Sequence, residues 1–269
     1  MTRLRNIGRA VLGLLAGAAL TGCASTPRCA LPEATALSSD GPPDAANSMR
    51  LARWDLDEGP VWWSETLPAS RPLEDYRRAV RALAPDLGQR ALMRRSLPFH
   101  DPATQRSIRV ALAELDASER PDRPVRPVQC LEAALLADQA RRMDMVKAPT
   151  EVLAYILRST DGRRLRVYAY TVNSAGIGRL GPLNDAVAPD LASGAWRFAV
   201  AFHNHNVFFD EPDLGGVVAP SVPDVQALTG LSDELGMAEA WITNGFDTGV
   251  WDAAALHRFA RPLTEPTPD

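Results

Sequence analysis

The sequence has little of the positive charge that a nucleic-acid-binding protein needs. Its 29 lysine and arginine residues are outnumbered by 33 aspartate and glutamate residues. Three of the basic residues and no acidic residue precede position 23, so the chain from there on carries 26 basic and 33 acidic residues, a net charge of −7. Proteins that bind nucleic acids usually present a basic face to the phosphates. We therefore expect no nucleic-acid partner.

The start of the chain lacks an apolar run long enough to cross a membrane. Residues 10–19 are all apolar or glycine, and they follow Arg3, Arg5 and Arg9 without an acidic residue. A membrane-spanning helix needs about 20 apolar residues. A shorter run after a basic segment is typical of an export signal that is cleaved off, here over residues 1–22.

The end of this segment carries a second signal, Leu20-Thr21-Gly22-Cys23. It resembles the lipobox of bacterial lipoproteins, which implies that Cys23 receives diacylglycerol and becomes the first residue after cleavage. The next residue is Ala24, not the aspartate that favours inner-membrane retention in that family. We expect attachment to a lipid membrane through Cys23, at the outer membrane facing the periplasm. A plain export signal with a chance cysteine is the alternative.

Cysteine is scarce, with three residues in the chain. With Cys23 assigned to lipid, Cys29 and Cys130 remain, and neither has the spacing of a metal-binding knuckle. An exported compartment permits a disulfide between them. Two free thiols are an equally good interpretation, because Cys29 falls in a segment that we expect to be flexible.

The composition of the first half predicts a tether and then a helical region. Residues 23–47 are rich in proline, serine, alanine and aspartate, which predicts a flexible tether. Residues 48–127 predict a helical N-terminal region, with apolar residues at three- and four-residue spacing over 73–84 and 102–115. The prolines within 117–127 indicate a linker.

Residues 128–260 predict a second domain of the α/β class, followed by a tail over 261–269. Asp161 and Gly162 stand between two apolar runs, which is a strong hairpin signal. Gly236 marks the end of a helix. The expected elements are a helix over 128–145, strands over 151–159, 164–172 and 196–203, a helix over 222–235, strands over 238–243 and 249–251, and a helix over 252–259.

One glycine pattern in this domain resembles a nucleotide-binding turn. Gly176, Gly178 and Gly181 match the spacing G-x-G-x-x-G, which binds phosphate when a helix follows directly. Pro182 stands at the next position, and we expect no helix to start there. We therefore interpret this segment as a loop.

Histidine is also scarce, but two of the four histidines stand together as His203 and His205, directly after an apolar strand. Residues two apart in an extended chain project to the same side, so both imidazoles can reach one metal ion. Asp224 falls in the first turn of the helix predicted from residue 222 and offers a carboxylate. Three protein ligands leave a fourth zinc position for water. Glu151 opens the first strand of this domain and is a candidate base that is not a ligand.

Together, Glu151, His203-x-His205 and Ser221-x-x-Asp224 resemble the JAMM motif of the JAB/MPN metallopeptidases. The resemblance implies a mixed sheet flanked by helices and a Zn²⁺ site. It implies that His203, His205 and Asp224 are the zinc ligands. It also implies that Glu151 is the general base that activates water and that Ser221 stabilises the oxyanion.

The resemblance covers roughly residues 128–260 and departs from the family in two places. The spacer of fifteen residues over 206–220 is longer than the family's usual one, and we expect a loop at the mouth of the site that gates or blocks it. Ala154 and Tyr155 replace the glycine that many members carry after the glutamate.

Each part of the motif also has a plainer interpretation. Ser221 and Asp224 fit a helix capping box, which needs no metal. The two histidines can follow a strand by chance, and Glu151 can be a surface acid. The four features in one order favour a metal site.

The sequence therefore leads to two hypotheses about function. The first is a zinc-dependent hydrolase, a peptidase or isopeptidase acting on a peptide or protein in the cell envelope. The second is a non-catalytic binding or scaffolding lipoprotein with the same fold. The long spacer favours the second hypothesis, as does the cluster of Trp54, Trp62 and Trp63, which otherwise belongs to a core or a contact surface.

Overall fold

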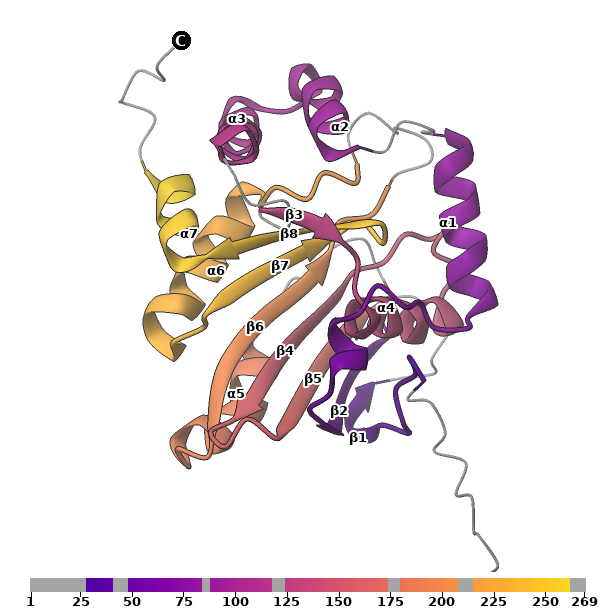
Figure 1. Ribbon diagram of the computed structural model, residues 1–269, viewed down its shortest axis with the longest axis vertical. Coiled ribbons are helices and arrows are strands. Elements are labelled where there is room, and N and C mark those ends of the chain that lie inside the picture. Colours follow the sequence, from indigo (N-terminus) through magenta and orange to yellow (C-terminus); the bar gives the residue numbers. More distant parts are fainter. Residues whose placement is uncertain are drawn as a thin grey trace, which may run out of the picture.

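A mixed sheet of eight strands lies at the centre of the computed structural model, which describes residues 28–40, 48–83, 88–117, 124–173, 180–207 and 215–261 (Figure 1). The strand order is β1-β2-β5-β4-β6-β7-β8-β3. Neighbouring strands are antiparallel except for β6 and β7, which are parallel. The strands are β1 (Thr35–Asp40), β2 (Met49–Asp57), β3 (Val125–Pro127), β4 (Val152–Ser159), β5 (Arg164–Val172), β6 (Trp196–Asn204), β7 (Glu239–Thr243) and β8 (Asp247–Asp252).

Helices cover both faces of this sheet. Helix α4 lies on one face together with α1 and the 3-10 helix η1, and helices α5, α6 and α7 lie on the other (Figure 1). Helix α3 packs against α6 and α7, and α2 packs against α3. The helices of the described residues are α1 (Arg71–Leu83), α2 (Gln89–Ser96), α3 (Pro102–Ala117), α4 (Cys130–Arg142), α5 (Gly181–Ala192), α6 (Val222–Leu235) and α7 (Ala253–Ala260), with 3-10 helices η1 (Pro60–Trp63) and η2 (Leu97–Phe99).

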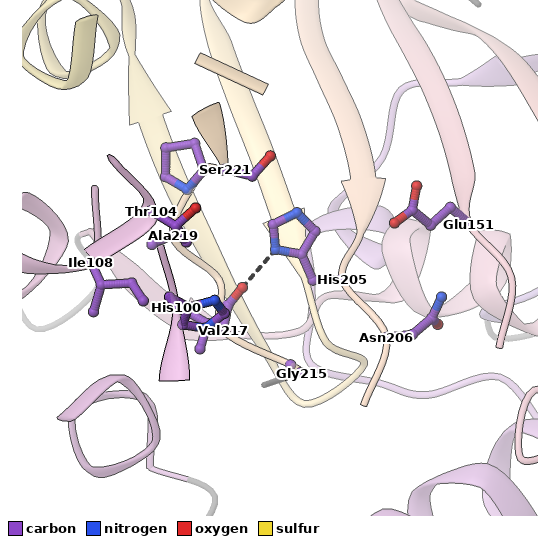
Figure 2. A pocket seen from close by; sticks show the side chains of 12 residues that line it. His100, Thr104, Ile108, Glu151, His205, Asn206, Gly215, Val217, Ala219 and Ser221 are labelled. Carbon is purple, nitrogen blue, oxygen red and sulfur yellow. Dashed lines mark hydrogen bonds between the residues drawn. The ribbon is translucent and has the colours of Figure 1, made fainter. Parts of the chain in front are cut away.

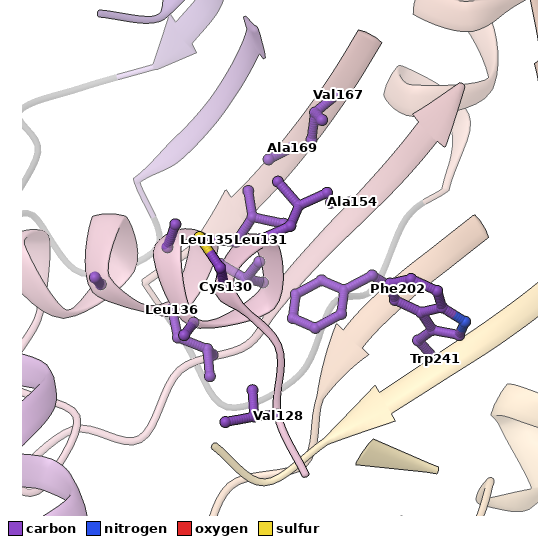
Figure 3. Packing of buried hydrophobic residues seen from close by; sticks show 14 of the residues in the cluster. Val128, Cys130, Leu131, Leu135, Leu136, Ala154, Val167, Ala169, Phe202 and Trp241 are labelled. Atoms are coloured by element: carbon purple, nitrogen blue, oxygen red, sulfur yellow. The ribbon is translucent and has the colours of Figure 1, made fainter. Parts of the chain in front are cut away.

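Alternation along the central strands builds two hydrophobic cores. In β4, Ala154 and Ile156 belong to the core on the α4 side, and Leu153 and Tyr155 belong to the core on the α6 side. Figure 3 shows the first core, where α4 side chains such as Leu131 lie over the sheet. Each fully buried side chain of this size contributes about 1.5 to 3 kcal/mol. A strand with apolar residues on both faces therefore fixes the centre of the sheet.

Most elements expected after residue 150 are confirmed. Strand β5 has the expected bounds, and Gly162 has a φ of 71° in the hairpin turn that precedes it. Helix α6 also has the expected bounds and ends at Gly236, whose φ of 69° lies in the left-handed region. The α/β class with a mixed sheet flanked by helices is confirmed.

The expected division into a tether, a helical region and a separate domain is wrong. Strand β1 lies within the segment expected to be a tether, and β2 lies within the expected helical region. Strand β3 lies in the expected linker and pairs with β8. All three strands join the same sheet as the later strands, because β2 pairs along its whole length with β5.

The tryptophan-rich segment belongs to the core. Trp54 lies on β2 and Trp62 in η1, and both are buried. Trp63 is partly buried and packs against the same cluster. The core interpretation is therefore confirmed for Trp54 and Trp62, and the segment no longer favours a contact surface.

Two helices were not expected. Helix α5 begins at Gly181 with Pro182 in its first turn, so the prediction that no helix starts there is wrong. A proline is tolerated at this position because the first N–H groups of a helix have no intrahelical partner. Residues 174–179, which hold the first two glycines of the pattern, lie outside the described part of the chain. Helix α2 was missed as well, since its few apolar residues show little periodicity.

A disulfide joins the start of the described chain to the core. Cys29 and Cys130 are bonded, with their Cα atoms 5.6 Å apart, so the disulfide interpretation is confirmed over two free thiols. The predicted signal and the lipid attachment at Cys23 lie outside the described residues and stay predictions, as does the tail beyond residue 261. In the described ranges, no helix combines the length and apolar character that a bilayer crossing requires.

Candidate metal centre

The end of strand β6 presents two histidines on one face of the sheet. His203 lies on β6, and His205 follows directly, where its backbone N–H donates to the carbonyl of Thr243 at 2.8 Å and extends the pairing with β7. Their side chains lie on the α6 side, because residues two apart share a face. The two Nε2 atoms are 3.1 Å apart.

The first turn of helix α6 brings a carboxylate to the same point. Ser221 is the N-cap of this helix, and its backbone N–H and its hydroxyl donate to Asp224 Oδ2 at 2.7 and 2.6 Å. The N–H of Asp224 donates back to the Ser221 hydroxyl at 3.4 Å. This is the capping box expected under the plainer interpretation. It also fixes the direction of the Asp224 carboxylate, so the capping and metal-binding interpretations hold together.

The three expected ligand side chains converge on one point. His205 Nε2 lies 3.1 Å from Asp224 Oδ2, and His203 Nε2 lies 3.4 Å from Asp224 Oδ1. One ligand atom from each residue falls within 4.8 Å of the others, and the three side chains are largely buried. This group could hold a metal ion. It is the one such group among the residues that the structure describes.

The other nitrogen of His205 sets the orientation of its ring. Nδ1 donates to the carbonyl of Val217 at 2.7 Å (Figure 2). That bond directs Nε2 toward His203 and Asp224. Histidines that bind a metal usually donate their other ring N–H to a carbonyl or carboxylate in this way, which fixes the orientation of the ring. Gln89 on α2 in turn accepts a hydrogen bond from the N–H of Val218 at 3.1 Å. Helix α2 therefore supports the His205 ring through the loop that follows the two histidines.

Gly216 allows this loop to pass close to the strand. Its φ is 76°, and a Cβ at this position would lie 2.7 Å from Cγ2 of Val207. Its N–H donates to the carbonyl of Asn206 at 2.9 Å and closes the described ends of the long spacer onto each other. Residues 208–214 lie outside the described part of the chain, so the predicted gating or blocking loop stays a prediction.

The electrostatic field between the three side chains favours a cation. Burial alone would lower the pKa of His205, but the hydrogen bond to Asp224 and the charges of Asp224 and Glu151 raise it to about 9. Burial would raise the pKa of Asp224, but the two histidines hold it well below its usual range. Without a metal, a proton on His205 thus supplies the positive charge that this arrangement stabilises.

Glu151 lies beside this group without belonging to it. It directly precedes β4, and it lines a cavity of about 220 Å³ together with His205 and Ser221. In Figure 2 it lies on one side of the His205 imidazole. Of the five residues of the expected motif, Glu151, His205 and Ser221 therefore line one cavity, and His203 and Asp224 contact His205.

The far wall of the cavity comes from a region that the motif does not include. His100 follows η2, and Thr104 and Ile108 lie one turn apart on α3. His100 lies on the opposite side of His205 from Glu151 in Figure 2. Burial, together with the charge of His205, holds its pKa below the usual value, although Asp101 opposes this. No spacing in the sequence connects His100 to the later histidines, and only the packing of α3 against α6 and α7 brings it here.

Comparisons with known proteins give no relative for this arrangement: no family model, no curated protein and no solved structure matches the chain.

Proposed function

We propose that the chain is a membrane-tethered, zinc-dependent peptidase or isopeptidase that hydrolyses an amide bond in the cell envelope. The observation that carries the proposal is the convergence of two imidazoles and a carboxylate on one point, with one of these imidazoles, that of His205, lining the same cavity as Glu151. The order of these residues supports a JAB/MPN-like domain. The envelope location rests on the lipobox at Cys23, with the outer membrane favoured by Ala24.

The donor set fits zinc. Imidazole nitrogens and a carboxylate oxygen are common zinc ligands, at bond lengths of about 2.0 to 2.1 Å that separate tetrahedral ligands by about 3.3 Å. The two Nε2 atoms are 3.1 Å apart, and their distances to the carboxylate of Asp224 are 3.1 Å to Oδ2 and 3.4 Å to Oδ1, which are close to this value. Three protein ligands are the number that a catalytic zinc takes, and His203, His205 and Asp224 would hold it.

Zinc bound there would polarise the scissile carbonyl and lower the pKa of water to about 7. Glu151 takes the proton of the attacking water and returns it to the nitrogen of the leaving amine. The hydroxyl of Ser221 turns from Asp224, to which it donates in the resting chain, toward the carbonyl oxygen as negative charge develops there. A well-aimed donor of this kind contributes about 2.7 to 4 kcal/mol.

The test combines metal content with cleavage of a peptide library by the purified full chain. We expect one zinc per chain in the wild type and none in His203→Ala, measured by elemental analysis. Glu151→Gln should retain zinc and lose activity by a factor of about 10² to 10⁴, since it removes the general base. A wild-type chain without zinc, or a Glu151→Gln variant with full activity, would contradict the proposal.

The scaffolding hypothesis has lost one of its two supports, because Trp54 and Trp62 are core residues. This hypothesis predicts that Glu151→Gln changes neither the affinity for a binding partner nor any measured activity. The same variant therefore separates the two functions.

A further inference from the structure

Two asparagines alternate with the two histidines at the end of β6. His203 and His205 face the α6 side of the sheet, so Asn204 faces the α4 side. Asn206 follows the strand and lines the cavity together with Glu151 and His205. Both amides are almost completely buried, with exposed fractions of 2% and 3%. Burying an amide costs free energy unless its polar atoms are hydrogen-bonded. Their partners therefore reveal what they do.

Together, the two asparagines bind the backbone before and after Glu151: Asn204 binds it on both sides, and Asn206 binds it on the side of Thr150. The N–H of Val152 donates to Asn204 Oδ1 at 2.7 Å. The Nδ2 groups of Asn204 and Asn206 donate to the carbonyl of Thr150 at 3.2 and 2.8 Å. One peptide group before Glu151 and one after it are thus held by side chains.

These bonds begin where the strand ladder ends. The pairing of β4 with β6 runs as far as Leu153 opposite His203. The backbones provide no further ladder bonds there, and the asparagine side chains continue the connection up to Thr150. Glu151 therefore stands where β4 and β6 separate, with its side chain at the cavity and its two flanking peptide groups held by Asn204 and Asn206.

The anchor has its own support. Asn204 Nδ2 also donates to Asn206 Oδ1 at 2.8 Å, which orients the second amide. Gln139 on α4, which is fully buried, donates from Nε2 to the hydroxyl of Thr150 at 2.7 Å. A connected buried network of this kind has few alternative arrangements.

We propose that Asn204 and Asn206 are positioning residues for Glu151. They fix the two peptide groups that flank it, and so set how its carboxylate meets a molecule held at the metal group. This inference rests on the proposed function, because it takes Glu151 to be the base. A base must lie within hydrogen-bond reach of its proton, and a displacement of about 1 Å can cost up to about 10²-fold in rate.

The test uses acetohydroxamic acid as a probe, so that no substrate is needed. A hydroxamate binds zinc through its oxygens and donates a hydrogen bond to a carboxylate beside the metal. Its dissociation constant is measured by calorimetry on the zinc-loaded full chain for the wild type, Asn206→Ala, Glu151→Gln and the double variant. Asn184→Ala is the matched control, because Asn184 on α5 makes one hydrogen bond with the hydroxyl of Tyr155 away from the cavity.

We expect Asn206→Ala to keep one zinc per chain and the unfolding midpoint of Asn184→Ala, but to bind the probe about tenfold more weakly than the control does. In the Glu151→Gln background the same change should have no further effect, since coupled residues are not additive. Wild-type affinity in Asn206→Ala, or an equal loss in both backgrounds, would overturn the proposal. If Asn206→Ala does not fold, Asn206→Ser replaces it with the same expectations.

The outcome is separable from that of the proposed function. Loss of probe affinity in Asn206→Ala, together with no cleavage of any peptide by the wild type, would support the positioning role and reject the peptidase. Absence of zinc from the wild type, or an unchanged affinity in Glu151→Gln, would overturn the positioning role itself.

Discussion

Helices α4 and α6 both begin with a capping box, but the acid of each box faces different partners. Each starts with a capping box whose acid at the third position accepts a hydrogen bond from the backbone of the cap residue, Glu132 from Gln129 and Asp224 from Ser221. Glu132 is fully buried and meets Arg126, which donates to its two oxygens at 2.8 and 3.0 Å.

The partners of the two acids make the difference. An arginine always carries its charge and complements a carboxylate with two parallel bonds, so the first cluster is complete by itself. Each of the two histidines can donate a proton to Asp224 or, when neutral, offer a nitrogen lone pair to a metal ion, so the second cluster can exchange a proton for a metal ion. The two acids therefore share one position in their helices and differ in what faces them, a guanidinium in α4 and two imidazoles in α6.

The largest expected effect is on the α4 side. Glu132→Ala should lower the free energy of unfolding by about 3 to 5 kcal/mol, because it leaves the guanidinium of Arg126 buried without its partner. Zinc content should not change. Denaturant unfolding with elemental analysis measures both, and Glu74→Ala on the exposed face of α1 is the control. Loss of zinc from Glu132→Ala would contradict the independence of the two clusters, since zinc binding would then depend on the pair of Glu132 and Arg126.

A smaller effect is expected from the metal itself. Zinc at a free concentration of about 100 times its dissociation constant should stabilise the wild type by about 2.7 kcal/mol, since it binds the folded state. Asp224→Ala should show no such increase, whereas Glu132→Ala should show all of it. Thermal unfolding with and without a chelator measures the difference. Equal zinc stabilisation in the wild type and Asp224→Ala would remove Asp224 from the ligands.

The smallest effect concerns the cap of α6. Ser221→Ala should lower the free energy of unfolding by about 1 kcal/mol, and Ser221→Gly by only a few tenths, because glycine is itself acceptable at an N-cap. Both variants should keep zinc, and both should lose activity through the missing hydroxyl. Wild-type turnover in Ser221→Gly would contradict the role of the hydroxyl in catalysis, and capping of α6 would be the one remaining role of Ser221.

The local part of the site was predictable from the sequence. His203 and His205 are brought together by strand alternation, and Asp224 by the cap of α6, so each placement depends on a few neighbouring residues. Helix α6 could be bounded because Pro223 marks its first turn and Gly236 its end. Glu151 needed one tertiary step, the pairing of β4 with β6.

The rest depended on contacts between distant segments. Strand β2 has a short alternating pattern, but its partner β5 begins more than a hundred residues later, and no local signal links them. Strand β3 has three residues and includes Pro127, which hides it among linker signals. His100 reaches the cavity only through the packing of α3, so neither its place nor the cavity wall could be expected.

The disulfide between Cys29 and Cys130 also limits the reach of the lipid attachment proposed at Cys23. A free tether over residues 23–47 would have allowed about 80 Å of extended chain. With Cys29 bonded to the start of α4, only five residues separate it from Cys23, a span of about 20 Å at full extension. A lipid on Cys23 would then hold Cys29 and the start of α4 within about 20 Å of the lipid surface. Reduction of the disulfide would lengthen this reach only as far as Thr35, where β1 begins to pair with β2.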